Sequence, residues 1–421
     1  MKRKNIIISF LILSLFIASF CIILSNSFSN NQNIIEDEEL IGTYIDGEYS
    51  ENIPNKDTGY VVEKIVCDNN AIGKWDYDNW GITLTNLSEK TKCNIHFRKG
   101  VKLADTINLV DTTGKCPTVN EDGTVNVTSA ESENSLLCSA PDNYGNSYYY
   151  RGNVTNNYVK FANFYWRIVR INGDGSIRMI YDGTVAHANG EASDDRIIGT
   201  SAFNEKNDDN AYVGYMYGTI GSSTYEKTHE NVNDSTIKKY LDIWYEQNIK
   251  DTNFEQYLLD NVFCNDRSLA KESVGDGFGK ITSYYRWFNT PWSGNILNKR
   301  IFLNCNQIND TFTVKDIIGN KKLKYSIGLI NMDEVTLAGA FGNKDLINNY
   351  IVSGVKYWTM SSAYFEKSED WAYLRRVGDN GDVDNRALAC YNYGVKPVIN
   401  LKPNSLTSGD GTINNPYTLS V

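Results

Sequence analysis

The sequence predicts an α+β domain with long loops, together with a small all-β domain and an N-terminal transmembrane helix. Three patterns support this fold class. An uncharged apolar run follows a basic N-terminus, β-branched segments separated by turn residues come next, and the long C-terminal part mixes hairpin, helical and strand patterns. The 421 residues carry a net charge of −10 and have no cluster of Lys and Arg beyond the N-terminus, so a nucleic-acid partner is not expected.

The N-terminus carries the signature of export. Three basic residues precede an apolar run over residues 6–24, which is just long enough for one membrane-spanning helix. The positive-inside rule then places the remaining chain outside the cell. Residues 1–27 are therefore predicted to be a signal anchor or a cleaved signal peptide, followed by a linker over residues 28–39. We expect a single-pass protein of the cell membrane with an extracellular bulk, or a secreted protein if cleavage occurs.

The cysteines fit an extracellular location, where thiols can be oxidised. One of the eight, Cys21, falls in the apolar run. Local spacing pairs six of the others as Cys67–Cys93, Cys116–Cys138 and Cys264–Cys305. None belongs to a CxxC motif or lies at metal-ligand spacing from a histidine, so neither a metal nor a cofactor is expected. Cys390 remains, either as a buried, inert thiol or because one of these pairs is different.

Residues 40–100 predict a small all-β module. A β-branched run over 60–67 and an alternating run over 92–97 flank segments rich in Asn, Asp and Gly. Trp75 and Trp80 are expected in the core of this module, with a sugar-stacking platform as the alternative. Residues 101–145 are poor in apolar side chains and are expected to form a linker clipped by a disulfide.

Residues 146–421 predict the α+β domain. The apolar runs 164–171 and 177–181 flank the turn sequence NGDG, which is typical of a β-hairpin. A helix is expected to begin at Asp234 or Ser235, because either residue is a good N-cap before an amphipathic pattern. Further elements are expected as a second helix over 254–262, a short helix from Asp333 to about Gly339, and strands over 326–330 and 395–401.

Two stretches resemble known bacterial sequences. Residues 40–100 resemble a small extracellular module of Gram-positive surface proteins, on the runs VCDNN (66–70), WD (75–76), WGI (80–82) and KCNIHF (92–97). Residues 146–421 resemble a family of uncharacterised surface domains, on the runs FYWRIV (164–169), FCNDRS (263–268), IGLINMDE (327–334), YWTMSS (357–362), GVKPVINL (394–401), GDGT (409–412) and NPY (415–417). That family looks related to the C-type-lectin-like fold of sulfatase-modifying factors, and it usually carries Arg at the position of Lys396.

Two classes of function follow. The first is a binding or adhesion protein of the cell surface that recognises a glycan, peptide or protein ligand without catalysis. A cell-envelope enzyme on the sulfatase-modifying-factor-like fold is the alternative. The first is favoured because His187 and His229 lie in polar segments, where a solvated histidine is expected, and because the paired-thiol site of the related enzymes is not expected here.

The candidate ligand-binding residues lie between the last two scaffold motifs. Residues 363–385 mix aromatic side chains with Asp, Asn and Gly, which is the composition of a recognition loop on a rigid frame. The candidates are Tyr364, Phe365, Trp371, Tyr373, Asp379 and Asp382. The oxygen-rich run 378–385 is expected to be a solvated turn, with a calcium loop as the alternative.

Overall fold

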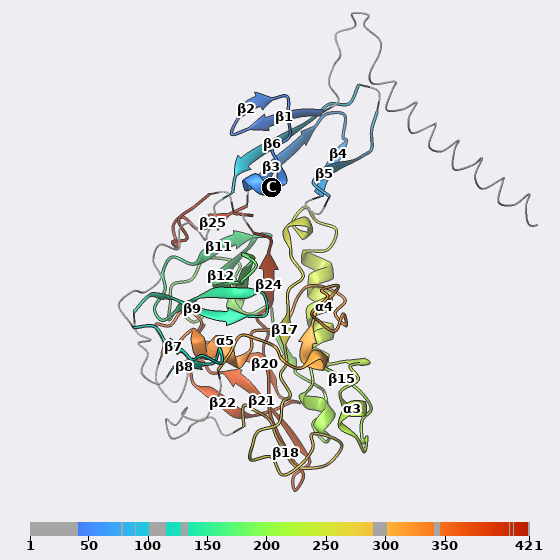
Figure 1. The fold of residues 1–421 in the computed structure, drawn as a ribbon, viewed down its shortest axis with the longest axis vertical. Coiled ribbons are helices and arrows are strands. Elements are labelled where there is room, and N and C mark those ends of the chain that lie inside the picture. Colours follow the sequence, from blue (N-terminus) through green and yellow to red (C-terminus); the bar gives the residue numbers. More distant parts are fainter. Residues whose placement is uncertain are drawn as a thin grey trace, which may run out of the picture. The chain divides into compact units, whose positions relative to one another are not determined.

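The computed structural model describes residues 41–76, 79–88, 90–100, 115–127, 134–288, 301–340, 346–403, 405–406 and 408–419. Strands dominate these residues, and their α-helices are three: α3 (Tyr225–Thr228), α4 (Thr236–Asn248) and α5 (Met332–Leu337) (Figure 1). The predicted α+β class is therefore wrong, because the described chain is mainly β. The helix expected over 254–262 contracts to a single 3-10 turn, η4 (Glu255–Tyr257), since Leu258 pairs with Leu401 instead.

The predicted transmembrane helix receives no support from the structure. Its residues, 6–24, lie outside the described residues. Within the described part of the chain, no helix is long and apolar enough to cross a bilayer. The chain divides into two units, Met1–Ile41 and Gly42–Val421, and the second unit holds nearly all that follows.

The small β module is built from a four-stranded sheet and a hairpin. The sheet has the order β2-β1-β6-β3. Its strands are β1 (Ile41–Ile45), β2 (Glu48–Ser50), β3 (Tyr60–Cys67) and β6 (Cys93–Lys99), and the hairpin is β4 (Ile72–Asp76) with β5 (Gly81–Thr85); η1 (Lys56–Thr58) precedes β3. Trp75 is buried edge-on against Phe97, with ring centroids 5.1 Å apart, as the core prediction requires. Trp80 is only half-buried, and its indole N–H donates to the Pro54 carbonyl at 2.7 Å.

A seven-stranded sheet begins the larger part of the chain. Its main path runs β24-β13-β12-β10-β9, and β11 joins β12 to β25. The strands are β9 (Leu136–Asp142), β10 (Gly145–Arg151), β11 (Tyr158–Phe161), β12 (Phe164–Ile171), β13 (Ile177–Gly183), β24 (Val398–Leu401) and β25 (Tyr417–Thr418). The β12–β13 hairpin is the one that the sequence predicts. β9 pairs with β10 along its length, so this sheet begins within the expected linker and before residue 146.

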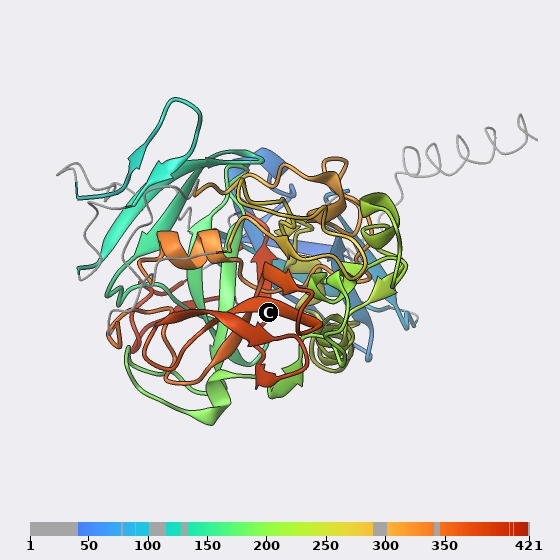
Figure 2. The ribbon, with the colours of Figure 1, turned by 90° about the horizontal axis from the view of Figure 1, so that it is seen from below.

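A six-stranded sheet forms the second large layer, seen from below in Figure 2. Its path is β14-β23-β20-β21-β22, with β18 paired to β20. The strands are β14 (Thr200–Ala202), β18 (Ser283–Tyr284), β20 (Tyr357–Glu366), β21 (Trp371–Val377), β22 (Val383–Leu388) and β23 (Asn392–Gly394). Residues 326–330, expected as a strand, contribute only one bridge, Gly328 to Val398.

Short elements complete the described chain. Three two-stranded ladders are β7 (Thr118–Val119) with β8 (Val125–Asn126), β15 (Met216–Tyr217) with β16 (Asn233–Asp234), and β17 (Phe263–Cys264) with β19 (Thr311–Phe312). The remaining 3-10 turns are η2 (Asp194–Arg196), η3 (Asn210–Val213) and η5 (Ile308–Asp310). α4 begins after Ser235, whose hydroxyl accepts the Lys238 N–H, so the predicted N-cap is confirmed.

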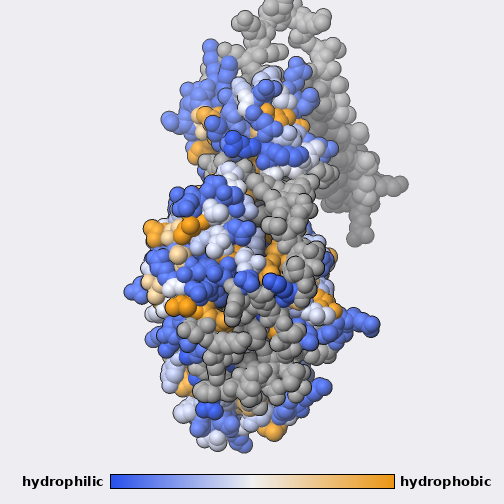
Figure 3. Space-filling model, turned by 90° about the vertical axis from the view of Figure 1, so that its left-hand side faces the viewer, coloured by the Kyte–Doolittle hydropathy of each residue, from blue (hydrophilic) through white to orange (hydrophobic). Residues whose placement is uncertain are grey.

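One hydrophobic core unites the two large sheets. It contains Trp166 and Met179 from the seven-stranded sheet and Trp358 and Leu374 from the six-stranded sheet. α5 contacts both β10 and β20, and a capping box between Asn331 and Glu334 satisfies its first backbone N–H groups. Outside the core, hydrophobic side chains on the face drawn in Figure 3 appear as small separate patches among hydrophilic ones.

The described residues hold three disulfides, and they are the three that local spacing predicts. Cys67–Cys93, Cys116–Cys138 and Cys264–Cys305 have Cα separations of 4.0, 5.6 and 5.7 Å. Cys390 is unpaired and partly exposed. Disulfides of this number fit a protein that folds outside the reducing cytosol.

Candidate functional site

Aromatic side chains cross the six-stranded sheet in one row. Tyr284 on β18 is paired with Tyr364 on β20, Tyr364 with Tyr373 on β21, and Tyr373 with Leu388 on β22. Paired residues of neighbouring strands point to the same face of a sheet. We call the three tyrosines, Tyr284, Tyr364 and Tyr373, the aromatic row. They form a hydrophobic cluster separate from the main core, whereas Phe365 and Ala372, one position along the strands, belong to the main core.

The rings of the aromatic row support one another. Tyr364 and Tyr373 are stacked with their centroids 4.3 Å apart. Tyr284 is stacked on Phe288 at 3.7 Å, and Phe288 meets Tyr364 edge-on at 5.2 Å. Burial raises the pKa of Tyr364 and of Tyr373, so both phenols stay neutral and serve as hydrogen-bonding groups at physiological pH.

Trp371 stands at the exposed end of this arrangement. It lies two residues before Tyr373 on β21, and therefore on the same face, and its ring meets that of Tyr373 edge-on at 6.0 Å. Its exposed fraction is 38%, against 9% for Tyr364 and 6% for Tyr373. Trp371 is thus the one predicted aromatic that offers a ring face or edge to a ligand, and the two tyrosines form its support.

Carboxylates and hydroxyls surround Trp371. Glu366 is its partner across the β20–β21 hairpin and accepts hydrogen bonds from Thr282 and Ser368. Glu369 accepts the Tyr373 hydroxyl at 3.3 Å, and Asp370 forms an exposed ion pair with Lys280 at 3.3 Å. The hairpin therefore presents one indole among hydrogen-bond acceptors.

The structure separates the predicted site residues into three groups. Trp371, Tyr364 and Tyr373 are together at one end of β21. Phe365 points away from them and is fully buried in the main core. Asp379 and Asp382 lie in the turn after β21, a whole strand of seven residues from Trp371 or about 20 Å, so they cannot share a small ligand with it.

The turn that carries the two aspartates is held by its own contacts. The Gly378 N–H donates to the Asp382 carbonyl at 2.7 Å, and the Asp382 N–H donates to the Asn380 side chain at 3.1 Å. Asp379 lies 3.9 Å from the Lys356 ammonium group. Among the residues that the structure describes, no group of three or more His, Cys, Asp or Glu side chains is arranged to hold a metal ion.

Both loop histidines are buried, contrary to the solvated state that we expected. His187 is 3% exposed and its ring nitrogens face Glu191 and Asp195 at 3.0 and 2.7 Å. His229 is stacked on Tyr225 at 3.7 Å, and burial lowers its pKa to about 2. Each histidine thus packs within the fold, His187 between two carboxylates and His229 on a tyrosine ring.

A buried cationic cluster escaped prediction because its members are far apart in sequence. Asp182 on β13 receives two guanidinium groups, Arg196 at 2.7 Å and Arg167 at 3.7 Å, and the ammonium group of Lys396 at 3.5 Å. All four side chains are at most 1% exposed. Burial, opposed by the Asp182 charge and reinforced by Arg196, lowers the pKa of Lys396 to about 7.

Sequence reasoning also missed Tyr284 and Phe288, which complete the aromatic support. The only signal for them was a short aromatic run in a polar segment, too short to identify a strand. Comparisons with known proteins add no assignment: no protein-family model, no curated protein and no solved structure matches this chain. The resemblances described above therefore rest on their sequence motifs alone.

Proposed function

We propose that this chain is a non-enzymatic extracellular binding protein, and that Trp371 with the aromatic row behind it forms the centre of its ligand site. The observation that carries the proposal is the exposed Trp371 indole, held on a rigid sheet by stacked tyrosines. Exposed aromatic residues on a rigid frame are the residues that most often dominate binding energy. The three disulfides support an extracellular location.

A glycan fits this surface better than a folded protein partner. One exposed indole has the size of one sugar ring, whereas a stable protein interface covers about 800 Å² on each partner. The carboxylates of Glu366, Glu369 and Asp370 accept hydrogen bonds, and sugar hydroxyls are donors. Binding without catalysis is favoured because the buried acids, among them Asp310 and Asp333, are engaged by Arg267 and Arg286 within the fold.

A glycan array tests the proposal, with purified cell walls as a second probe and the full-length protein as the sample. The test variant is Trp371→Ala, and the matched control is Tyr391→Ala, an aromatic residue that is 48% exposed and lies outside the aromatic row. Truncating a dominant aromatic costs about 2 kcal/mol, so Trp371→Ala should weaken binding about 30-fold, while Tyr391→Ala should bind like the parent.

Conservative replacement sharpens the test. Trp371→Phe keeps a ring on the same support and should retain part of the affinity. Equal binding by the parent and Trp371→Ala, with folding unchanged by circular dichroism, would rule out this site. A ligand that proves to be a protein and leaves the array blank would overturn the glycan assignment.

A further inference from the structure

The loop that follows β19 presents an unusual tip. Its central residue, Ile317, is 89% exposed, and the next, Ile318, is 37% exposed. Lys315, Lys321 and Lys322 flank them and are all exposed. Single exposed aliphatic side chains are common on proteins, but two adjacent ones flanked in sequence by three exposed lysines combine apolar and basic character. We call residues 315–322 the Ile-Lys tip.

The base of the Ile-Lys tip is rigid. The Asp260 carboxylate accepts three successive backbone N–H groups, from Val314, Lys315 and Asp316, at 2.8, 2.5 and 2.9 Å. Asp316 in turn accepts the Tyr144 hydroxyl at 2.8 Å and the Ile318 N–H at 2.8 Å. The two isoleucines are therefore exposed by a fixed backbone and cannot simply turn inward.

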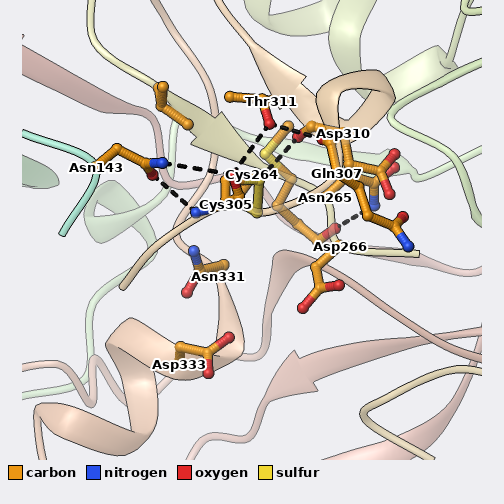
Figure 4. Close-up of a disulfide and its surroundings, with 12 residues drawn as sticks. Asn143, Cys264, Asn265, Asp266, Cys305, Gln307, Asp310, Thr311, Asn331 and Asp333 are labelled. Carbon is orange, nitrogen blue, oxygen red and sulfur yellow. Dashed lines mark hydrogen bonds between the residues drawn. A yellow bond between two sulfur atoms is a disulfide. The ribbon is translucent and has the colours of Figure 1, made fainter. Parts of the chain in front are cut away.

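A disulfide anchors the strand from which the tip projects. Cys264 on β17 is bonded to Cys305, and β17 pairs with β19 directly before the loop. Figure 4 shows Asn143 on one side of this disulfide and Thr311 and Gln307 on the other. The Asn143 side chain accepts the Cys305 N–H at 2.7 Å, and the Thr311 hydroxyl donates to the Gln307 carbonyl at 2.6 Å.

Backbone contacts close the loop on its other side. The Asn320 N–H donates to the Thr311 carbonyl at 2.7 Å, and the Leu323 N–H donates to the Thr313 carbonyl at 3.0 Å. The loop therefore leaves the frame and returns to it within a few residues. This closed loop leaves the Ile317 side chain exposed, because the loop does not fold back over it.

The charge of the tip is opposite to that of the chain. Residues 315–322 hold three lysines and one aspartate, a net charge of +2, while the whole chain carries −10. The nearby acids are engaged elsewhere, Asp260 and Asp316 with the loop backbone and Glu246 with Lys324 at 2.5 Å. Within the described residues, none of the three lysines forms an ion pair, so their charge is available to an external partner.

We propose that the Ile-Lys tip docks on an anionic phospholipid surface, with Ile317 and Ile318 inserted among the acyl chains and the lysines on the headgroups. A bilayer is the partner that supplies an apolar phase and negative charge side by side. A soluble polyanion would satisfy the lysines but would leave both isoleucines in water. Lysine stems also suit this position, because they lie along apolar surface while the ammonium group stays at the headgroups.

The test uses the full-length protein with vesicles of phosphatidylglycerol and phosphatidylcholine, and with vesicles of phosphatidylcholine alone. The readout is local: the rate at which a water-soluble amine reagent acetylates each lysine, followed by mass spectrometry. This readout separates the tip from any other part of the chain that binds vesicles. Lys239, exposed on α4, is the internal reference.

We expect the anionic vesicles to slow acetylation of Lys315, Lys321 and Lys322 at least about threefold, with Lys239 unaffected. The double variant Ile317→Ser with Ile318→Ser should abolish this protection, because burial of one aliphatic side chain alone changes partitioning about tenfold or more. Each lysine changed to Gln should weaken partitioning about fivefold.

The matched control is Val274→Ser, at another aliphatic residue that is 71% exposed but has no place in the tip. This control should keep the full protection. Equal acetylation rates in the two kinds of vesicle would overturn the proposal. Protection that survives in the double serine variant would overturn it as well, because the lysines would then be responding to charge alone.

Discussion

Replacing Lys396 by Met should flatten the pH dependence of stability. The Lys396 ammonium group is 1% exposed and has one carboxylate, Asp182, at 3.5 Å, which two arginines already share. Burial lowers its pKa to about 7 in the folded protein, while the pKa of a lysine in the unfolded chain is about 10.4. Between these values the unfolded state binds the extra proton, so the free energy of unfolding should rise with pH.

The pKa difference sets the size of the effect. A full proton difference gives about 1.4 kcal/mol per pH unit, and the partial titration of Lys396 at neutral pH reduces the expected gain between pH 7 and pH 9 to about 2 kcal/mol. Lys396→Met keeps an unbranched apolar stem of similar volume and removes the amine. The variant should therefore be at least as stable as the parent at pH 7, and its advantage should shrink toward pH 9.

Urea unfolding at pH 7, 8 and 9, with the disulfides intact, measures this difference. Lys239→Met is the matched control, because that lysine is exposed on α4 and its hydration changes little on folding. Parallel stability curves for the parent and Lys396→Met would refute the reasoning. So would a large loss of stability in the variant at pH 7, which would mean that the buried ammonium group is a net stabilising partner of Asp182.

Three further predictions concern stability. Replacing Cys264 and Cys305 by Ser should lower the free energy of unfolding by roughly 3–4 kcal/mol, from the chain entropy of the loop that the disulfide closes, and an unchanged urea midpoint would contradict this. Asp195→Asn should destabilise the protein at neutral pH and lose its effect as the pH falls below about 4. Partial burial acts to raise the pKa of Asp195, but hydrogen bonds from Ser193 and Thr184 outweigh it and lower that pKa. The stabilisation is therefore present above the unfolded pKa and disappears in acid, as an acid titration followed by circular dichroism can show. Asn331→Ala should cost about 1 kcal/mol by removing the capping box of α5, and calorimetry should show a lower melting temperature, whereas Asn331→Asp should retain most of the stability.

Local signals predicted part of this fold. The β12–β13 hairpin followed from two apolar runs around a Gly-rich turn. The start of β10 packs closely against this turn, because a Cβ on Gly173 would lie 2.4 Å from the Gly145 nitrogen. The start of α4 followed from Ser235 and an amphipathic pattern. The disulfides followed from short spacing, because nearby cysteines in sequence meet at low entropic cost.

Long-range pairing explains the failures. Leu258 and Leu259 carry a helical pattern, but Leu258 bridges to Leu401 and the Leu259 N–H donates to the Asn400 carbonyl, so contact with β24 outweighs local helix propensity. Gly328 approaches the Phe263 ring so closely that a Cβ would lie 2.4 Å from it, which suits a single close contact better than a strand. Neither partner could be read from the sequence around these residues.

The candidate site was predicted in composition but not in geometry. Tyr364 and Phe365 are adjacent in a strand, and successive side chains of a strand point to opposite faces. Only one of the two could therefore belong to the aromatic row. The same alternation separates Trp371 and Tyr373 from Ala372 and Leu374. The period-two pattern was present in the sequence, and an interpretation of residues 363–377 as two strands would have excluded Phe365.

Buried arginines explain how long irregular segments remain ordered in a mainly β chain. A loop has no regular ladder for its backbone carbonyls, and a buried carbonyl without a donor is costly. Arginine side chains supply these donors: Arg167 donates to the Val154 carbonyl, and Arg196 donates to the Glu191 carbonyl while it pairs with Asp182. A guanidinium group can bind a carboxylate and a carbonyl at once, which a lysine ammonium group does less precisely. The loops are thus tied to the core by side chains that composition alone would assign to the surface.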